Sequence, residues 1–221
     1  MNPFVKFAAA AVLATGIAGP ALASDTAEVL AHSNATVTDL RHDPVFGDAR
    51  HALREARAVL IIPGLVKGGF IFGAEGGDGV LLARTRHGWS DPAFYSLGSA
   101  SFGLQAGLEQ SQLVMIIMTD RALRAVERSK FKFGADAGLT VITLGAGAGA
   151  ATSGNLTGDI ILWSKSKGVY GGITLNGSVI APEDDTNARF YGHPVSVPDI
   201  LSGGAKNPAA GPLRANLSSA F

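Results

Sequence analysis

Short apolar runs rich in β-branched residues, separated by glycine, fill the chain from residue 58 onward and set the strongest limit on its fold. Residues 59–62 are a continuous run of this kind, which is typical of a strand buried on both faces, and residues 113–118 are another. Glycine makes up 29 of the 221 residues, about twice its usual share. Because glycine inside strands suits sharp bends and close backbone contact, the pattern predicts a Gly-rich antiparallel sheet or a small barrel-like sandwich.

Glycine, proline and aspartate mark where the strands are expected to end. We expect Pro63-Gly64 to end the first strand. The segment Gly76–Gly79 contains an Asp-Gly pair and is predicted to form a hairpin turn. His87-Gly88 is a further expected turn, and a hairpin is predicted across Lys165–Gly168.

Helical spacing is confined to a few segments. Residues 24–57 are predicted to form two short helices, the second starting near Asp43, because the residue before a proline disfavours helix. An amphipathic helix is expected over Thr119–Ser129, with Thr119 or Asp120 as its cap. Short helices are also expected over residues 184–190 and near Leu213. Helices that precede a run of strands indicate an α+β fold, with N-terminal helices packed on the sheet and one internal amphipathic helix.

The first residues have the pattern of a cleavable signal peptide. Lys6 precedes an apolar run over Phe7–Ala18, and small residues at Ala21 and Ala23 predict cleavage before Ser24. The alternative is a retained membrane anchor, which needs about 20 apolar residues, more than this run has. We therefore expect residues 1–23 to be a signal peptide and residues 24–221 to be a single domain that is periplasmic or secreted.

Charge and cysteine content exclude several classes of function. Loss of Lys6 from 18 basic and 18 acidic residues leaves 17 against 18, so the exported chain has a net charge of −1. A nearly neutral chain is not a general electrostatic binder of nucleic acid. With no cysteine, the chain has no disulfide, thiolate metal site or thiol nucleophile.

No motif predicts catalysis, a cofactor or a metal. The Gly/Ala segment 145–151 is not followed by the lysine that a phosphate-binding loop needs. The histidines are scattered, without metal-ligand spacing. Glu75 and Glu109 lie in apolar, Gly-rich surroundings, so they are either paired carboxylates with a function or acceptors of hydrogen bonds from loop amides or an arginine. We expect a protein that is not an enzyme.

A cluster of cations stands out in this nearly neutral chain. Arg121, Arg124 and Arg128 have the i, i+3, i+7 spacing of one helical face. Lys130 and Lys132 follow directly. We call these five residues the basic segment. Their side chains either bind lipid phosphate, arginine in a bidentate manner, or form an ordinary solvated helix face paired with its own acids.

Several blocks of sequence, in a fixed order across most of the domain, resemble one known family. The blocks are residues 58–63, 67–73, 77–80, 89–93, 103–109, 119–123, 132–137, 166–172 and 187–192. Together they resemble the SYLF domain family, also known as the Ysc84-type actin-binding domain.

The resemblance implies binding of phospholipids, of phosphoinositides in eukaryotic members, and of actin filaments in some of those members. Because an exported protein does not meet cytosolic actin, we expect actin not to be a partner. The sequence thus predicts an exported SYLF-type protein that binds anionic phospholipid at the membrane or cell envelope, with the basic segment as its lipid contact. The alternative is a structural or assembly module that binds a protein partner in the envelope.

Overall fold

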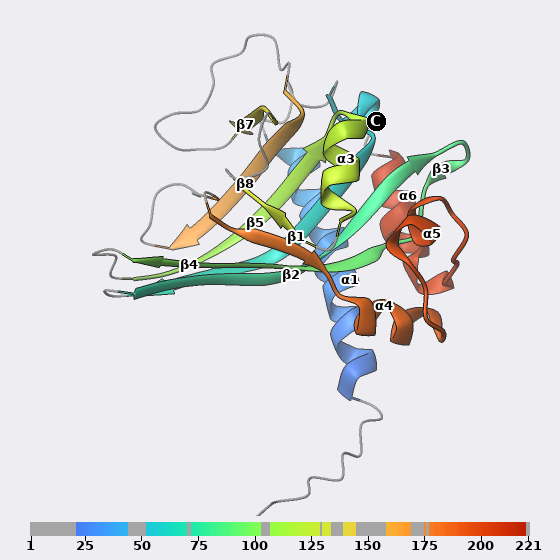
Figure 1. Ribbon diagram of the computed structural model, residues 1–221, viewed down its shortest axis with the longest axis horizontal. Helices are drawn as coiled ribbons and strands as arrows, with labels where there is room; N and C mark the ends of the chain where they lie inside the picture. Colours follow the sequence, from blue (N-terminus) through green and yellow to red (C-terminus); the bar gives the residue numbers. More distant parts are fainter. Residues whose placement is uncertain are drawn as a thin grey trace, which may run out of the picture.

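The computed structural model describes residues 21–43, 52–69, 72–102, 107–128, 130–133, 139–144, 158–168, 175 and 177–219. These residues form one curled sheet with helices on both of its faces (Figure 1). The predicted α+β class is therefore confirmed. Residues 1–20 of the predicted signal peptide and the Gly/Ala segment 145–151 lie outside the described residues, whereas residues 21–23 begin the first helix.

In the described part of the chain, nine strands pair in the order β6-β9-β4-β2-β1-β5-β8-β7, with β3 beside β2. The strands are β1 (Ala58–Gly69), β2 (Phe72–Thr85), β3 (Gly88–Trp89), β4 (Ala93–Phe102), β5 (Gly107–Ile117), β6 (Phe131–Lys132), β7 (Val141–Leu144), β8 (Ile160–Gly168) and β9 (Val179–Pro182). All pairs are antiparallel except β7 with β8, which is parallel.

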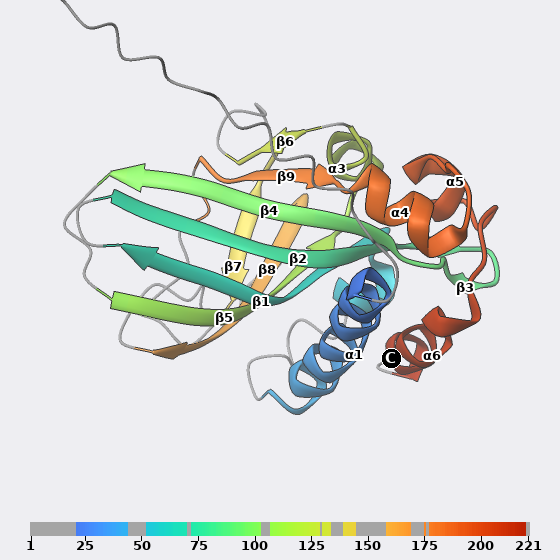
Figure 2. The same cartoon turned by 90° about the horizontal axis from the view of Figure 1, so that it is seen from below.

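The helices are α1 (Ala21–His42), α3 (Asp120–Val126), α4 (Asp184–Tyr191), α5 (Val197–Leu201) and α6 (Gly211–Ser219), with a 3₁₀ turn over Pro208–Ala210. Residues 52–55 are also helical. Figure 2 shows α1 and α6 on one side of the sheet and α3 and α5 on the other. Among the described residues, no helix combines the length and the apolarity needed to cross a bilayer.

Each face of the sheet has its own apolar core. Leu60 and Ile62 of β1 point into the core shared with α3 and α5, whereas Val59 and Ile61 point into the core beneath α1 and α6. This alternation follows from the two-residue period of a strand. Residues 58–62 are completely buried, as the continuous apolar run predicts.

The prediction that Pro63-Gly64 ends the first strand is wrong. β1 continues to Gly69, and its register with both neighbours shifts in this region, between Ile61 and Val66 against β2 and between Ile62 and Leu65 against β5. Proline lacks a backbone donor and is tolerated inside a sheet mainly at edges or bulges. The two residues therefore form a bulge in a central strand.

The predicted hairpin turn at Gly76–Gly79 is also wrong, because β2 runs straight through it. Gly69 pairs with Gly73, so the chain reverses earlier. A Cβ added to Gly77 would come within 2.8 Å of the Gly64 carbonyl oxygen, and one added to Gly79 would collide with the Ile61 carbonyl oxygen. These glycines are needed for close approach of β1, and not for positive φ.

Two other boundaries differ from expectation. β8 extends through residues 165–168, so the hairpin predicted there does not form and its lysines lie in a strand. α3 ends at Val126, three residues before the predicted Ser129. The expected turn before Gly88 is present, with Gly88 at a φ of 110°.

Candidate functional site

α3 is fixed to the sheet by its cap and its inner face. Thr119 Oγ1 accepts a hydrogen bond from the Ala122 N–H at 3.2 Å, as the predicted N-cap requires. Ala122 and Val126 are buried in the core, and the Tyr95 hydroxyl donates to the Val126 carbonyl at 3.2 Å. The inner face of α3 is thus packed against the core, and the cationic side chains of α3 face outward.

Arg121 is bound to a neighbouring carboxylate that the sequence analysis missed. Its Nη2 lies 2.7 Å from Asp159 Oδ2. The Thr140 N–H donates to the same oxygen at 3.0 Å, and Thr119 Oγ1 donates to Oδ1 at 2.7 Å. These hydrogen bonds, that of Thr140 first, hold the pKa of Asp159 below its ordinary value. Arg121, although exposed, therefore has a role in the fold.

The other four cations of the basic segment, Arg124, Arg128, Lys130 and Lys132, are all exposed. Because α3 ends at Val126, Arg128 lies beyond the helix. The prediction that three arginines share one helical face is therefore wrong: only Arg121 and Arg124 belong to α3. The basic segment is instead a helix end, a connection and a short strand.

Buried neighbours hold the end of the basic segment in place. Lys132 lies in β6 between Phe131 and Phe133, which are buried in the core with ring centroids 5.0 Å apart. Of the acids nearby, Asp120 pairs with Arg57 at 3.3 Å. Burial raises the pKa of Glu127, and Arg124 partly opposes that rise. The segment therefore keeps an excess of exposed positive charge.

A second polar cluster lies on the face of the sheet that carries α3. Lys67 of β1 is directly opposite Glu75 of β2 on one side and Glu109 of β5 on the other. Ser99 Oγ donates to Glu75 Oε2 at 3.4 Å, and Ser111 Oγ donates to Glu109 Oε1 at 3.3 Å. We call these five residues the polar layer.

Glu75 and Glu109, the two glutamates marked as unusual in the sequence, thus lie on the two strands that flank β1, one on each side of Lys67. Their described partners are serine hydroxyls, where loop amides or an arginine had been considered. No local sequence pattern assigns a role to Lys67. Only the strand register would have indicated a role, because it places Lys67 between the two glutamates.

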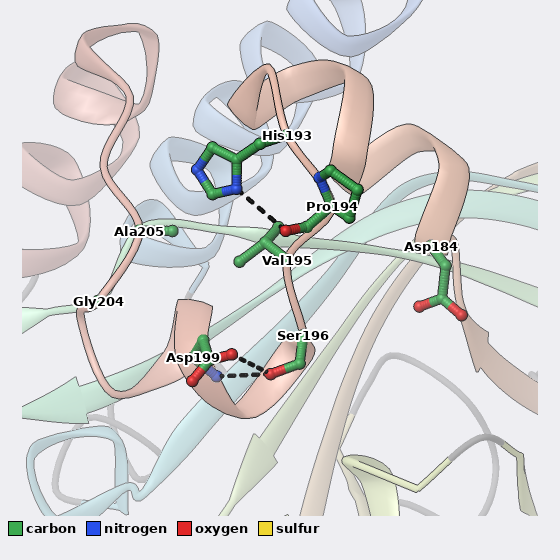
Figure 3. A pocket seen from close by; sticks show the side chains of 8 residues that line it. All are labelled: Asp184, His193, Pro194, Val195, Ser196, Asp199, Gly204 and Ala205. Carbon is green, nitrogen blue, oxygen red and sulfur yellow. Dashed lines mark hydrogen bonds between the residues drawn. The ribbon is translucent and has the colours of Figure 1, made fainter.

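An open pocket of about 660 Å³ lies where α4 passes into α5 (Figure 3). Two of its polar residues serve the local turn: Ser196 Oγ donates to Asp199 Oδ2 at 2.5 Å and accepts from the Asp199 N–H at 3.2 Å. His193 Nδ1 lies 3.0 Å from the Pro194 carbonyl oxygen. Ser196 and Asp199 of this pocket are therefore already engaged with each other.

No metal centre is formed by the described residues, since no group of three or more His, Cys, Asp or Glu side chains converges among them.

Comparison with known proteins identifies the family. The family model Ysc84, described as "Las17-binding protein actin regulator", matches residues 98–220. This chain belongs to the Ysc84 family. The resemblance to SYLF domains is therefore confirmed. The matched region contains the whole basic segment, whereas Lys67 and Glu75 precede it.

Relatives from yeast and human support the assignment. The chain is 34% identical to Protein YSC84 of Saccharomyces cerevisiae over 168 residues, covering 74% of this chain and 36% of the relative. It is 33% identical over 162 residues to LAS seventeen-binding protein 3 of the same yeast, covering 72% and 35%. It is 30% identical over 161 residues to SH3 domain-containing YSC84-like protein 1 of Homo sapiens, covering 72% and 47%. The chain thus spans less than half the length of these relatives.

The expectation that actin is excluded as a partner is wrong. It rested on export alone, while the family to which the chain belongs is described as an actin regulator.

Proposed function

We propose that this member of the Ysc84 family is a non-enzymatic protein that binds anionic phospholipid, and that the exposed part of the basic segment provides the phosphate contacts. The observation that carries the proposal is the exposure of Arg124, Arg128, Lys130 and Lys132 beside a core that holds their backbone in place. Arginine and lysine in such a setting suit phosphate oxygens, arginine through two parallel hydrogen bonds.

The expected strength of binding is that of a peripheral protein. Each cation close to an anionic membrane contributes about 1 kcal/mol. Arg124, Arg128, Lys130 and Lys132 together would contribute about 4 kcal/mol, which gives reversible binding that weakens with salt. The contribution of Arg121 is smaller, because its guanidinium is already paired with Asp159.

Vesicle co-sedimentation tests this proposal. The variant carries Arg124→Glu, Arg128→Glu and Lys130→Glu. Its matched control carries the same charge change at exposed residues elsewhere: Arg54→Glu, Arg189→Glu and Lys206→Glu. We expect the wild type and the control to sediment with anionic vesicles at low salt, and the variant to remain in solution. Equal sedimentation of variant and control would reject the basic segment as the contact.

Export is part of the proposal. The signal-peptide pattern supports a location in the periplasm or outside the cell, where the protein would act at the membrane or envelope. Mass spectrometry of the protein from its native host should find a mature N-terminus at Ser24. Recovery of the uncleaved N-terminus in a soluble cytosolic fraction would contradict export.

The second candidate function is binding to a protein partner, and the description of the family as Las17-binding and actin-regulating favours it. Relatives carry names of this kind, although the chain spans only 36% of Protein YSC84. Sedimentation with filamentous actin in the absence of lipid tests this candidate. Binding that persists at high salt, and in the charge-reversed variant, would favour a protein-binding surface outside the basic segment.

A further inference from the structure

The polar layer lies where the apolar interior of the curled sheet ends. Leu65, Leu97 and Leu113 belong to the buried core on this face. Lys67, Ser99 and Ser111 each lie two residues from one of these leucines in the same strand, so they point to the same face. One end of each of the strands β1, β2, β4 and β5 extends to the left in Figures 1 and 2. Toward these ends, the side chains on this face therefore change from leucine to charged and hydroxyl groups.

The polar layer carries more buried negative than positive charge. Glu75 is 7% exposed and Glu109 is 1% exposed, while the single cation opposite both is Lys67. Burial raises the pKa of Glu75, and the Lys67 ammonium and the Ser99 hydroxyl partly oppose that rise. Two carboxylates and one ammonium leave a net charge of −1 when all are ionised.

One carboxylate oxygen in this layer is also unsatisfied. Glu109 Oε1 accepts from Ser111, but Glu109 Oε2 is buried without a hydrogen-bond partner. A buried charged acceptor without a donor is strongly unfavourable, and such groups in native proteins call for an explanation. A donor is therefore missing at Glu109 Oε2, and a donor that carries positive charge would also offset the excess of carboxylates in the layer.

We infer that the polar layer is a binding site for a primary ammonium group, with Glu109 Oε2 as its principal acceptor and Glu75 as the second carboxylate. Lys67 and Ser99 are only partly buried, so the layer reaches the surface beside them. A primary ammonium carries N–H donors that satisfy the unpartnered oxygen, whereas a trimethylammonium group has no such donor. The site thus distinguishes ethanolamine from choline.

Such a group has two sources: a soluble amine, or the headgroup of an aminophospholipid. If the ligand is a lipid headgroup, the inference rests on the proposed function. The lipid bound at the basic segment and the lipid bound at the polar layer would then belong to the same membrane. The ammonium of phosphatidylethanolamine would then approach the glutamates, and the phosphate would approach Lys67.

The experiment uses the full chain with two readouts. The first is titration with free ethanolamine, with choline as the matched ligand control, followed by NMR. The second is co-sedimentation with vesicles that hold a fixed fraction of anionic lipid and either phosphatidylethanolamine or phosphatidylcholine as the remainder. The variant is Glu109→Gln. Its control is Glu28→Gln, the same change at an exposed position.

We expect the wild type and Glu28→Gln to bind ethanolamine about tenfold more tightly than choline, and Glu109→Gln to lose this preference. If the source is lipid, the same preference appears between the two kinds of vesicle; if it appears only with free ethanolamine, the source is a soluble amine. Absence of any preference in the wild type, or its retention in Glu109→Gln, would overturn the inference.

Two further comparisons keep the result interpretable. Should Glu109→Gln fail to fold, the wild type alone decides, through the difference between ethanolamine and choline. Charge reversal at Arg124, Arg128 and Lys130 should abolish binding to anionic vesicles but leave the ethanolamine titration unchanged. Failure of the proposed lipid contact is therefore distinguishable from failure of the ammonium site.

Discussion

The two halves of the central strands differ sharply, although they belong to the same sheet. In the half nearest the helices, residues 58–62 of β1 are fully buried on both faces. In the other half, Val66 is 44% exposed and Gly76 and Gly98 of the neighbouring strands are exposed. The near half also has bulky apolar side chains, whereas the far half has glycine, serine and the polar layer.

This difference indicates that the two halves of the sheet have different roles. Burial of apolar area is the main stabilising term in folding, and the near half contains most of it. Buried charges such as Glu75 and Glu109 oppose folding unless they are well paired. We infer that the near half sets the stability of the protein and that the far half is available for binding. Substitutions in the two halves should therefore have opposite effects on stability.

The largest effect on stability is expected for Gly79→Val, at the junction between the two halves of β2. The new side chain would collide with the backbone carbonyl of Ile61, which has no means of moving away without distorting β1. We expect a loss of about 3 kcal/mol in the free energy of unfolding, at the upper end of the range for overpacking. Urea denaturation measures it. Gly64→Ala is the control, since a Cβ there meets nothing within 4 Å, and equal destabilisation by both substitutions would contradict the packing argument.

A smaller loss is expected for Arg214→Ala in the near half. Arg214 Nη1 lies 2.8 Å from Asp91 Oδ1, and Asp91 is 1% exposed. Without the arginine, the Asn207 N–H, which donates to Asp91 Oδ2 at 2.6 Å, is the carboxylate's remaining described partner. We expect a loss of about 2 kcal/mol, since a buried carboxylate is left incompletely paired. Arg189→Ala removes an exposed arginine as a control, and a loss as large there would show that the ion pair is not the cause.

Removal of the α3 cap should have a still smaller effect. Thr119→Ala removes the oxygen that accepts from the Ala122 N–H and the donor to Asp159. The expected loss is about 1 kcal/mol. Thr119→Ser keeps the hydroxyl and should retain most of the stability. Thermal unfolding of the two variants compares them, and identical midpoints would argue against a role for the hydroxyl.

The far half should respond in the opposite direction and most weakly. Burial raises the pKa of Glu75 above its ordinary value of 4.5. The stability linked to this group is therefore fully present below pH 4.5 and is lost as the pH rises through the raised pKa. Glu75→Gln removes that loss, so the variant should be more stable than the wild type at neutral pH, with a difference that shrinks in acid. A variant less stable than the wild type at neutral pH would contradict the assignment of Glu75 to a binding role.

Much of the near half could be predicted from sequence, because its signals are local. The buried run at residues 59–62 and the Thr119 cap each depend on neighbouring residues, and both predictions are confirmed. Pro63-Gly64 and Gly79 were misinterpreted because glycine and proline serve bulges and close contacts as well as turns. Only the register of the partner strand shows whether such a residue forms a turn, a bulge or a close contact.

The candidate sites depend on contacts between distant residues, which local patterns do not reveal. The cations of the basic segment can be recognised from the sequence alone. The partner of Arg121, Asp159, cannot be recognised in this way because it lies 38 residues away in the chain. The sequence likewise marks Glu75 and Glu109 as unusual. Their relation to Lys67 appears only when β2 and β5 are paired on either side of β1.

The contact between the basic segment and an anionic membrane is the central claim, and a fluorescent label tests it most directly. The chain has no cysteine, so Lys130→Cys gives a single attachment point for an environment-sensitive dye. Ser218→Cys, exposed on α6 across the sheet, is the control. The account predicts that anionic vesicles shift the emission of the dye at residue 130 to the blue and leave that at residue 218 unchanged. Equal shifts at both positions, or a shift only at residue 218, would contradict it.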